Sequence, residues 1–341
     1  MFKAMNKKVV RPLATGAAIL SALLGLQSIG RADEIVTNPG YRVSIFALNP
    51  PQASNPDSVA VDGNKVFIGY GDGTKSDGSD GLPSTVAQFT ASGKLVRIFK
   101  VPGHNDGLRV NPTDHQVYAL LNQDGNSRLT IINPKTGAEK TYDLPSVNGP
   151  KGGYDDLVFL NGQIFVTPSS PTLTSDGINP YPILATLSLT DDQAIVTPVL
   201  QGNTAAVDSA TGESITLNLK DPDSLGITPD GDLIITGEND RNVVVVKHPG
   251  CSSQEVTVIS HPEFVADDTI FAPATKSSLL VADDKDQAVY LIKGPFESGT
   301  AYISNTTAGA VGTLDTTTGA FSSVLTGIPS PHGLGFLPRN K

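Results

Sequence analysis

Six short segments of the chain begin with a side chain that can carry charge and continue as an apolar strand. Two examples are Asp57-Ser58-Val59-Ala60-Val61 and Asp223-Ser224-Leu225-Gly226-Ile227. Five starts are aspartates and one is a histidine; they are Asp57, Asp106, Asp155, Asp223, Asp268 and His332. Several carboxylates held close together repel one another unless a cation or shared protons neutralise them. If the six starts converge on one axis, they form a ring of candidate metal ligands.

The ligand types in this ring favour a hard cation. Carboxylate oxygens select Ca²⁺ or Mg²⁺, and a single imidazole also admits Zn²⁺ or Mn²⁺. Ca²⁺ is expected first, because its flexible coordination tolerates a ring better than octahedral or tetrahedral geometry does. A structural role is the alternative, since an aspartate in a turn before a strand often accepts backbone N–H bonds and ties strands together. Both roles stay open for each member of the ring.

One residue of this ring, Asp106, and one residue beside it, His104, are candidates for catalysis. His104 precedes Asp106 by two positions, and either side chain could move a proton to or from a substrate. More polar residues follow the second strand of each repeat, so one face is expected to be acidic with a central cleft. No His-Glu-x-x-His, Gly-x-Ser-x-Gly or P-loop motif occurs, and no nucleophilic triad is visible.

The spacing of the strand starts predicts the elements that would position them. The starts recur at intervals of 45 to 68 residues, and a period of this size that carries strands indicates a radial β-repeat. The first repeat predicts strands at 57–61, 65–70, 84–90 and 95–101. Four strands per repeat is typical of a β-propeller blade. The sequence therefore predicts an all-β fold, a propeller for which the six strand starts favour six blades, with five or seven blades as the alternatives.

The later repeats are less regular. The third is longer, and the excess is assigned to a hairpin at 205–219. The fifth is expected to continue through strands at 279–281 and 288–292. Little chain follows His332, so the N-terminal strand at 41–48 is expected to close the last blade, which also removes an exposed sheet edge.

Composition restricts the partners and the location. The 341 residues carry a formal net charge of −10, which argues against nucleic acid or anionic lipid. Basic residues, then an apolar run at 13–26 and small residues near Ala32, predict a signal peptide at 1–32 and one propeller domain at 33–341. An uncleaved anchor is the alternative. A secreted or periplasmic monomer is expected, with no membrane contact after cleavage; the one cysteine, Cys251, cannot form a disulfide within the chain.

The strand starts and the blade pattern resemble the six-bladed propellers of the SMP-30/gluconolactonase and NHL-like superfamily. The resemblance implies a divalent cation at the top of the tunnel and, in enzymatic members, hydrolysis of lactones or organophosphates. Those enzymes hold the metal with Glu, Asn and Asp, whereas this chain offers mainly Asp plus His332. Two functions follow as expectations. One is a metal-dependent, lactonase-like hydrolase of a small molecule, and the other is a non-catalytic propeller that binds a ligand or protein and keeps a structural cation.

Overall fold

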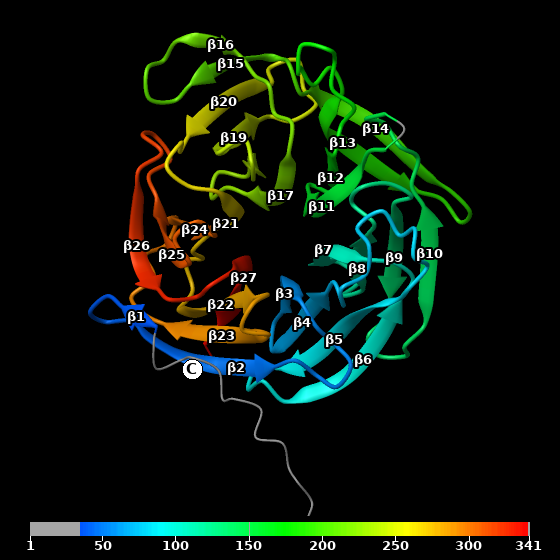
Figure 1. Ribbon diagram of the computed structural model, residues 1–341, viewed down its shortest axis with the longest axis vertical. Coiled ribbons are helices and arrows are strands. Elements are labelled where there is room, and N and C mark those ends of the chain that lie inside the picture. The colour runs from blue at the N-terminus through cyan, green and yellow to red at the C-terminus, as the bar shows by residue number, and fades with distance from the viewer. Residues whose placement is uncertain (1–34, 150, 340–341) are drawn as a thin grey trace, which may run out of the picture. The chain divides into compact units, whose positions relative to one another are not determined.

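Six sheets are arranged radially around one axis in the computed structural model, which describes residues 35–149 and 151–339 (Figure 1). The six-bladed, all-β propeller predicted from the sequence is therefore confirmed. The predicted signal peptide lies outside the described residues. Within the described part of the chain, no helix has the length and apolar character needed to cross a membrane.

The first three blades follow chain order. Each has four strands, and their order from the axis to the outer edge of the blade is their order in the sequence. Blade 1 consists of β3 (Pro56–Asp62), β4 (Lys65–Tyr70), β5 (Ser84–Thr90) and β6 (Leu95–Val101). Blade 2 consists of β7 (Asn105–Val110), β8 (Val117–Leu121), β9 (Arg128–Ile132) and β10 (Glu139–Asp143). Blade 3 consists of β11 (Gly153–Leu160), β12 (Gln163–Ser169), β13 (Pro182–Leu189) and β14 (Ala194–Gln201).

Blade 4 is the largest blade, with six strands. Its four inner strands are β17 (Pro222–Ile227), β18 (Leu233–Gly237), β19 (Asn242–Lys247) and β20 (Glu255–Ser260). The hairpin of β15 (Ala205–Asp208) and β16 (Ser214–Thr216) extends this blade, because β15 pairs in parallel with β20. The assignment of this hairpin to the third repeat was therefore wrong.

The chain alternates between blades 5 and 6, so neither blade is formed by consecutive strands alone. Blade 5 consists of β21 (Ala266–Phe271), β24 (Ala301–Asn305), β25 (Ala310–Leu314), β26 (Phe321–Thr326) and β1 (Val36–Thr37). Blade 6 consists of β27 (Pro331–Pro338), β22 (Ser277–Asp283), β23 (Ala288–Lys293) and β2 (Arg42–Leu48). Closure by the N-terminal strand is confirmed, since β2 pairs with β23. The expectation that β22 and β23 belong with β21 was wrong, because the chain leaves blade 5 after β21 and returns to it at β24.

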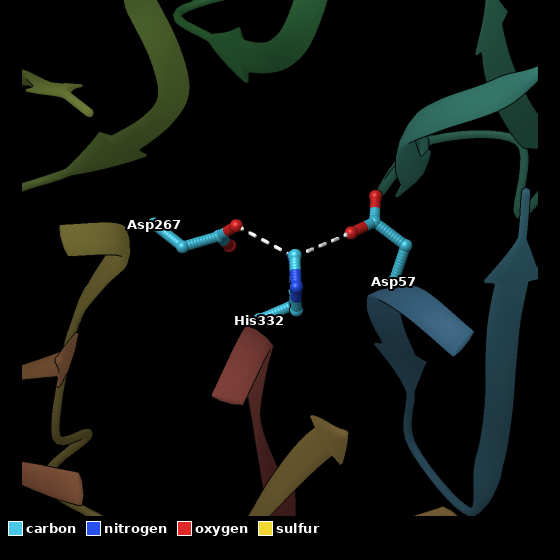
Figure 2. A group of neighbouring side chains, drawn as sticks. All are labelled: Asp57, Asp267 and His332. Carbon is cyan, nitrogen blue, oxygen red and sulfur yellow. Dashed lines mark ion pairs between the residues drawn. The ribbon is translucent and has the colours of Figure 1, made fainter. Parts of the chain in front are cut away.

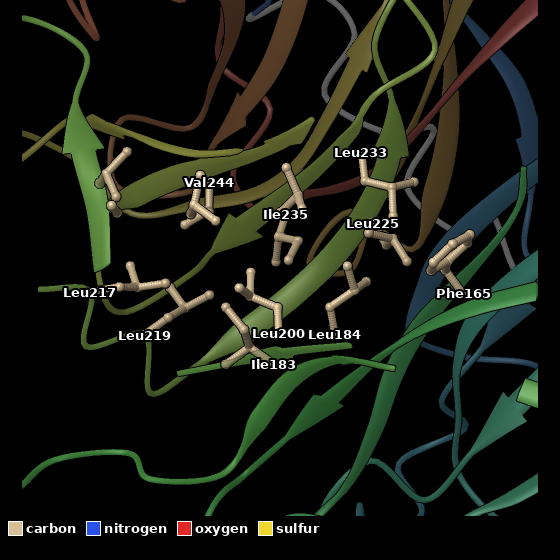
Figure 3. Packing of buried hydrophobic residues seen from close by; sticks show 14 of the residues in the cluster. Phe165, Ile183, Leu184, Leu200, Leu217, Leu219, Leu225, Leu233, Ile235 and Val244 are labelled. Atoms are coloured by element: carbon tan, nitrogen blue, oxygen red, sulfur yellow. The ribbon is translucent and has the colours of Figure 1, made fainter. Parts of the chain in front are cut away.

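Apolar side chains fill the spaces between neighbouring blades. Figure 3 shows one such cluster, in which side chains of blade 3 such as Phe165 and Leu184 pack on blade 4. Leu233 and Ile235 alternate along β18 and are completely buried in this cluster. The alternation of apolar residues along each strand thus serves the contact between blades, and it holds the inner strands around the axis.

Leu233→Ala is expected to lower the free energy of unfolding by about 2–5 kcal/mol, because it leaves a cavity in a fully buried contact between blades. Urea denaturation followed by far-UV circular dichroism measures this change. Ile195→Ala is the matched control, since Ile195 is 49% exposed on β14 and its truncation should cost less than about 0.5 kcal/mol. Equal denaturation midpoints for the two variants would contradict this account of the packing.

Candidate functional site

Each of the six innermost strands carries a β-bulge close to its start. The pairing register skips two residues in each, between residues 56 and 59, 105 and 108, 154 and 157, 222 and 225, 266 and 269, and 331 and 334. A bulge sets two residues against one on the partner strand and redirects their side chains. The two skipped residues of all six strands line one cavity. The repeated bulge is therefore the local structure that brings the strand starts together.

The first skipped position holds an ionisable residue in every blade: Asp57, Asp106, Asp155, Asp223, Asp267 and His332. Five of these six residues are the predicted strand starts. In blade 5 the equivalent residue is Asp267, and the predicted Asp268 lies one position later. The sequence offers two adjacent aspartates there, and aligning Asp155-Asp156-Leu157 with Asp267-Asp268-Thr269 would have identified the first.

The cavity has a volume of 470 Å³ and is dominated by carboxyl groups. Ten aspartates and one glutamate line it: Asp57, Asp106, Asp124, Asp155, Asp156, Asp221, Asp223, Asp267, Asp268, Asp284 and Glu238. The basic side chains among its lining residues are Arg109, His104 and His332. All seven predicted site residues therefore lie at one cavity, while their roles as metal ligands or catalytic groups stay predictions.

His332 joins two carboxylates that come from different blades. Its Nδ1 lies 3.0 Å from Asp57 Oδ1 and 2.8 Å from Asp267 Oδ2, as Figure 2 shows. Its Nε2 lies 3.2 Å from Ser330 Oγ. Burial alone would lower the pKa of His332, but the charges and hydrogen bonds of Asp267 and Asp57 raise it to about 12. The imidazolium therefore balances charge on one side of the ring.

The second skipped position ties neighbouring blades together where it holds an aspartate. Asp156 accepts a hydrogen bond from the Leu225 backbone N–H at 2.9 Å, and Asp268 accepts one from Leu334 N–H at 2.8 Å. Arg109 forms an ion pair with Asp156 and also donates to the carbonyl of Leu225 at 3.0 Å. Among the predicted strand starts, Asp268 thus has the structural role of an aspartate that ties two strands together, and it does so through its Oδ2 atom. Sequence patterns gave no indication of the role of Arg109.

Burial is the main electrostatic cost in this cavity. It raises the pKa of Asp106, Asp155 and Asp223 well above the usual range, and repulsion between neighbouring carboxylates adds to the rise. Burial also raises the pKa of Asp156 to about 7, although Arg109 opposes this. Burial and the charge of Asp267 raise the pKa of Glu238 to about 7. The ring is therefore poorly suited to full ionisation without further positive charge.

The metal-free protein is expected to lose stability as pH rises from about 4 to about 7. In this window the folded state holds protons on Asp156 and Glu238 that the unfolded state has released. This stabilisation is complete below the unfolded pKa values and is lost as pH rises through the folded ones. Exposed carboxyls with a lowered pKa, such as Asp315, change the stability only at pH values below this window. Urea denaturation in chelator at several pH values checks this, and a midpoint that rises across the window would contradict it.

His104 faces the cavity with its hydrogen-bonding state fixed by Thr74. The Thr74 hydroxyl donates its hydrogen to the carbonyl of Gly71 at 2.7 Å and lies 3.0 Å from His104 Nδ1. Because that single hydrogen is already used, Thr74 accepts from Nδ1–H, which leaves a lone pair on Nε2 of the neutral ring. A Cβ at position 71 would lie 2.7 Å from His104 Cε1, so the ring needs glycine beside it. His104 is thus prepared to accept a proton at Nε2.

The cavity offers carboxylate oxygens, which are the donors that hard divalent cations prefer. Among the described residues, Asp57, Asp267 and His332 form a group whose ligand atoms all lie within 4.8 Å of one another. Carboxylate oxygens of Asp106, Asp155 and Asp223 come from three successive blades and have no basic side chain as an ion-pair partner among the described residues. Asp223 Oδ2 and Asp268 Oδ1 are buried and have no hydrogen-bond partner in the described part of the chain. Buried polar atoms without partners are costly, and a cation would satisfy them. Oxygen-rich sites of this kind suit Ca²⁺ or Mg²⁺.

Comparison with known proteins identifies the fold. No protein-family model matches the chain, and no curated protein matches it. A solved structure of streptogramin B lyase is 14% identical, with 88% of this chain and 95% of that chain covered and a TM-score of 0.53. A calcium-binding protein, regucalcin, from Agrobacterium tumefaciens is 12% identical over 84% of this chain and 80% of its own, with a TM-score of 0.47. A putative gluconolactonase is 13% identical over 87% and 84%, also with a TM-score of 0.47.

These likenesses concern the fold alone. The streptogramin B lyase structure, with a TM-score of 0.53, shares the fold of this chain. At 12–14% identity they transfer no ligand and no activity. Function therefore has to be argued from the cavity itself.

Proposed function

We propose that the protein is an exported propeller that holds a divalent cation, Ca²⁺ first, among its tunnel carboxylates and acts as a lactonase-like hydrolase. One observation carries this proposal: eleven carboxyl side chains line one cavity, in which Arg109 and His332 are the basic side chains that form ion pairs with these carboxylates. Asp106, Asp155 and Asp223 would hold the cation, and their carboxylates would have to move closer together to do so, because the described group with ligand atoms within 4.8 Å of one another is Asp57, Asp267 and His332. Export is supported by the basic and apolar N-terminal segment.

The cation would supply electrostatic polarisation of the substrate carbonyl. The chain's own residues supply proton transfer. His104 Nε2 accepts a proton from water as the water oxygen attacks the carbonyl carbon, and Thr74 keeps the ring in the required state. The ester C–O bond of the lactone ring then breaks, and the proton passes from His104 to the released alkoxide. The product is a hydroxy acid, and no further reactant is consumed.

Turnover tests this proposal directly. The purified protein is assayed against a panel of lactones and phosphotriesters, each with Ca²⁺, Mg²⁺, Mn²⁺ or Zn²⁺ after chelation. Hydrolysis of at least one lactone that stops with chelator and returns with a cation is the expected result. No turnover above background with any cation would overturn the catalytic part of the proposal.

A structural cation without catalysis is the second candidate. The observation that favours it is the use of Asp156 and Asp268 to tie blades together within the same cavity. In that case chelation lowers the melting temperature, and no lactone or phosphotriester is hydrolysed under any condition. A melting temperature that chelation leaves unchanged would exclude a structural cation in the ring.

A further inference from the structure

The cavity keeps a large excess of negative charge even when a cation is counted. Eleven carboxyl groups line it, whereas Arg109 and the His332 imidazolium contribute one positive charge each. A divalent cation adds two more. The carboxyl groups that line the cavity therefore outnumber these positive charges, so the lining favours cations over anions.

Three carboxylates outside the ring, Asp124, Asp221 and Asp284, are held by neutral groups. Asp284 Oδ1 accepts from Asn55 Nδ2 at 2.6 Å, and Asp221 Oδ2 accepts from the backbone N–H and the side-chain amide of Asn239. Asp124 accepts from two serine hydroxyls. Hydrogen bonds from amides and hydroxyls orient a carboxylate without cancelling its charge. No lysine occurs among the described residues that line the cavity.

The one arginine of the cavity does not offset this charge for an incoming molecule. Arg109 Nη2 is engaged by Asp156 and by the carbonyl of Leu225, and Nη1 donates to the carbonyl of Leu108 at 3.1 Å. Arg109 also lines a second, apolar cavity formed by the later residues of the six inner strands. It therefore lies between the acidic and apolar parts of the tunnel. The guanidinium group of Arg109 thus already forms its ion pair and hydrogen bonds with groups of the propeller itself.

We propose that the substrate of this site carries a positive charge, such as a quaternary or protonated amine, and lacks a free carboxylate or phosphate. The proposal rests on the hydrolytic function proposed above and names the class of substrate for it. A cavity lined by one sign of charge concentrates ligands of the opposite sign and raises their association rates by about 10- to 1,000-fold. The same field repels anionic lactones.

Three lactones that carry different charges test this proposal. They are γ-butyrolactones carrying trimethylammonium, tert-butyl or carboxylate at the same carbon, where the first two substituents have nearly the same shape. The cationic lactone is expected to show a kcat/KM about tenfold or more above that of the tert-butyl lactone, and the carboxylate should be the poorest substrate. The difference should shrink in about 0.5 M salt. Equal values for the first two lactones would overturn the proposal.

Cyclopentanones with the same three substituents separate binding from catalysis, because they cannot be hydrolysed. Calorimetric titration is expected to show the tightest binding for the trimethylammonium ketone. If no lactone is hydrolysed but this ketone binds preferentially, hydrolysis is wrong and the charge preference stands. If lactones are hydrolysed without a charge preference in either assay, hydrolysis stands and this inference is wrong.

Asp284→Asn tests the position of the charge. It removes one negative charge from the cavity and keeps an oxygen that accepts from Asn55. The preference for the trimethylammonium ketone should fall about two- to threefold. Asp230→Asn is the matched control, because it changes the net charge equally in an exposed turn that lines a different cavity. A preference that Asp230→Asn lowers as much as Asp284→Asn would contradict an effect that belongs to the cavity.

Discussion

Asp223→Asn is expected to weaken Ca²⁺ binding by about 100-fold and, at the same time, to make the metal-free protein more stable. The loss of affinity follows because a charged ligand from the half of the ring without His332 is replaced by a neutral one. The gain in stability follows because the Asp223 Oδ2 atom is buried without a hydrogen-bond partner among the described residues, and because burial and neighbouring carboxylates raise the pKa of Asp223. Asp106→Asn and Asp155→Asn should behave alike, since burial raises both pKa values.

Two measurements on the same variants check this prediction. Calorimetric titration gives the Ca²⁺ affinity, and urea denaturation in chelator near neutral pH gives the stability, which should rise by about 0.5–2 kcal/mol as expected when a functional-site strain is removed. Asp57→Asn is an informative comparison, because Asp57 is already paired with His332 at 3.0 Å and its loss should reduce affinity less. Asp223→Asn with unchanged Ca²⁺ affinity would contradict the assigned ligand set.

His104→Gln is expected to lower kcat for the best lactone by about 10²- to 10⁴-fold, which is the usual contribution of a positioned general base. Ca²⁺ affinity and stability should change little, because His104 lines the cavity but lies outside the proposed ligand set. Thr74→Val should lower kcat by a smaller factor, since it removes the acceptor that holds Nδ1–H. The pH profile of the Thr74→Val variant should also change, because the His104 ring is then free to change tautomer.

His248→Gln is the matched control for His104→Gln. His248 is an exposed histidine beyond β19, where its Nδ1 lies 3.4 Å from the carbonyl of Ser253. Its replacement should leave kcat unchanged. Full activity of His104→Gln would show that the proton is accepted elsewhere, and Asp106 would then be the next group to test.

The sequence favoured the observed number of blades and identified five of the six residues at the first skipped position, because one local feature recurs. An ionisable residue, a spacer and an apolar residue mark each inner strand, and the bulge that turns these side chains toward the cavity falls at the same place in all six. Asp267 was missed for a local reason. Two adjacent aspartates fit the pattern, and only the pairing of Ala266 with Asn305 and of Thr269 with Ile303 fixes which comes first.

The exchange between blades 5 and 6 could not be read from the sequence. Strand β22 follows β21 after a short connection, which locally resembles a hairpin, yet β22 pairs with β27 near the C-terminus. Apolar alternation indicates that a strand is buried but not which neighbour buries it. The ion pairs of the cavity could not be predicted from the sequence for the same reason. Arg109 reaches Asp156, and His332 reaches Asp57 and Asp267, only after distant segments have been brought together.

Metal analysis tests the central claim most directly. The protein is loaded with Ca²⁺, freed of unbound ions by gel filtration and analysed for bound metal before and after chelation. The same procedure is applied to the triple variant Asp106→Asn/Asp155→Asn/Asp223→Asn. The account predicts about one tightly bound cation per chain in the natural protein and none in the chelated protein or the triple variant. A natural protein that retains no divalent cation, or a triple variant that retains as much, would contradict a cation site in this ring.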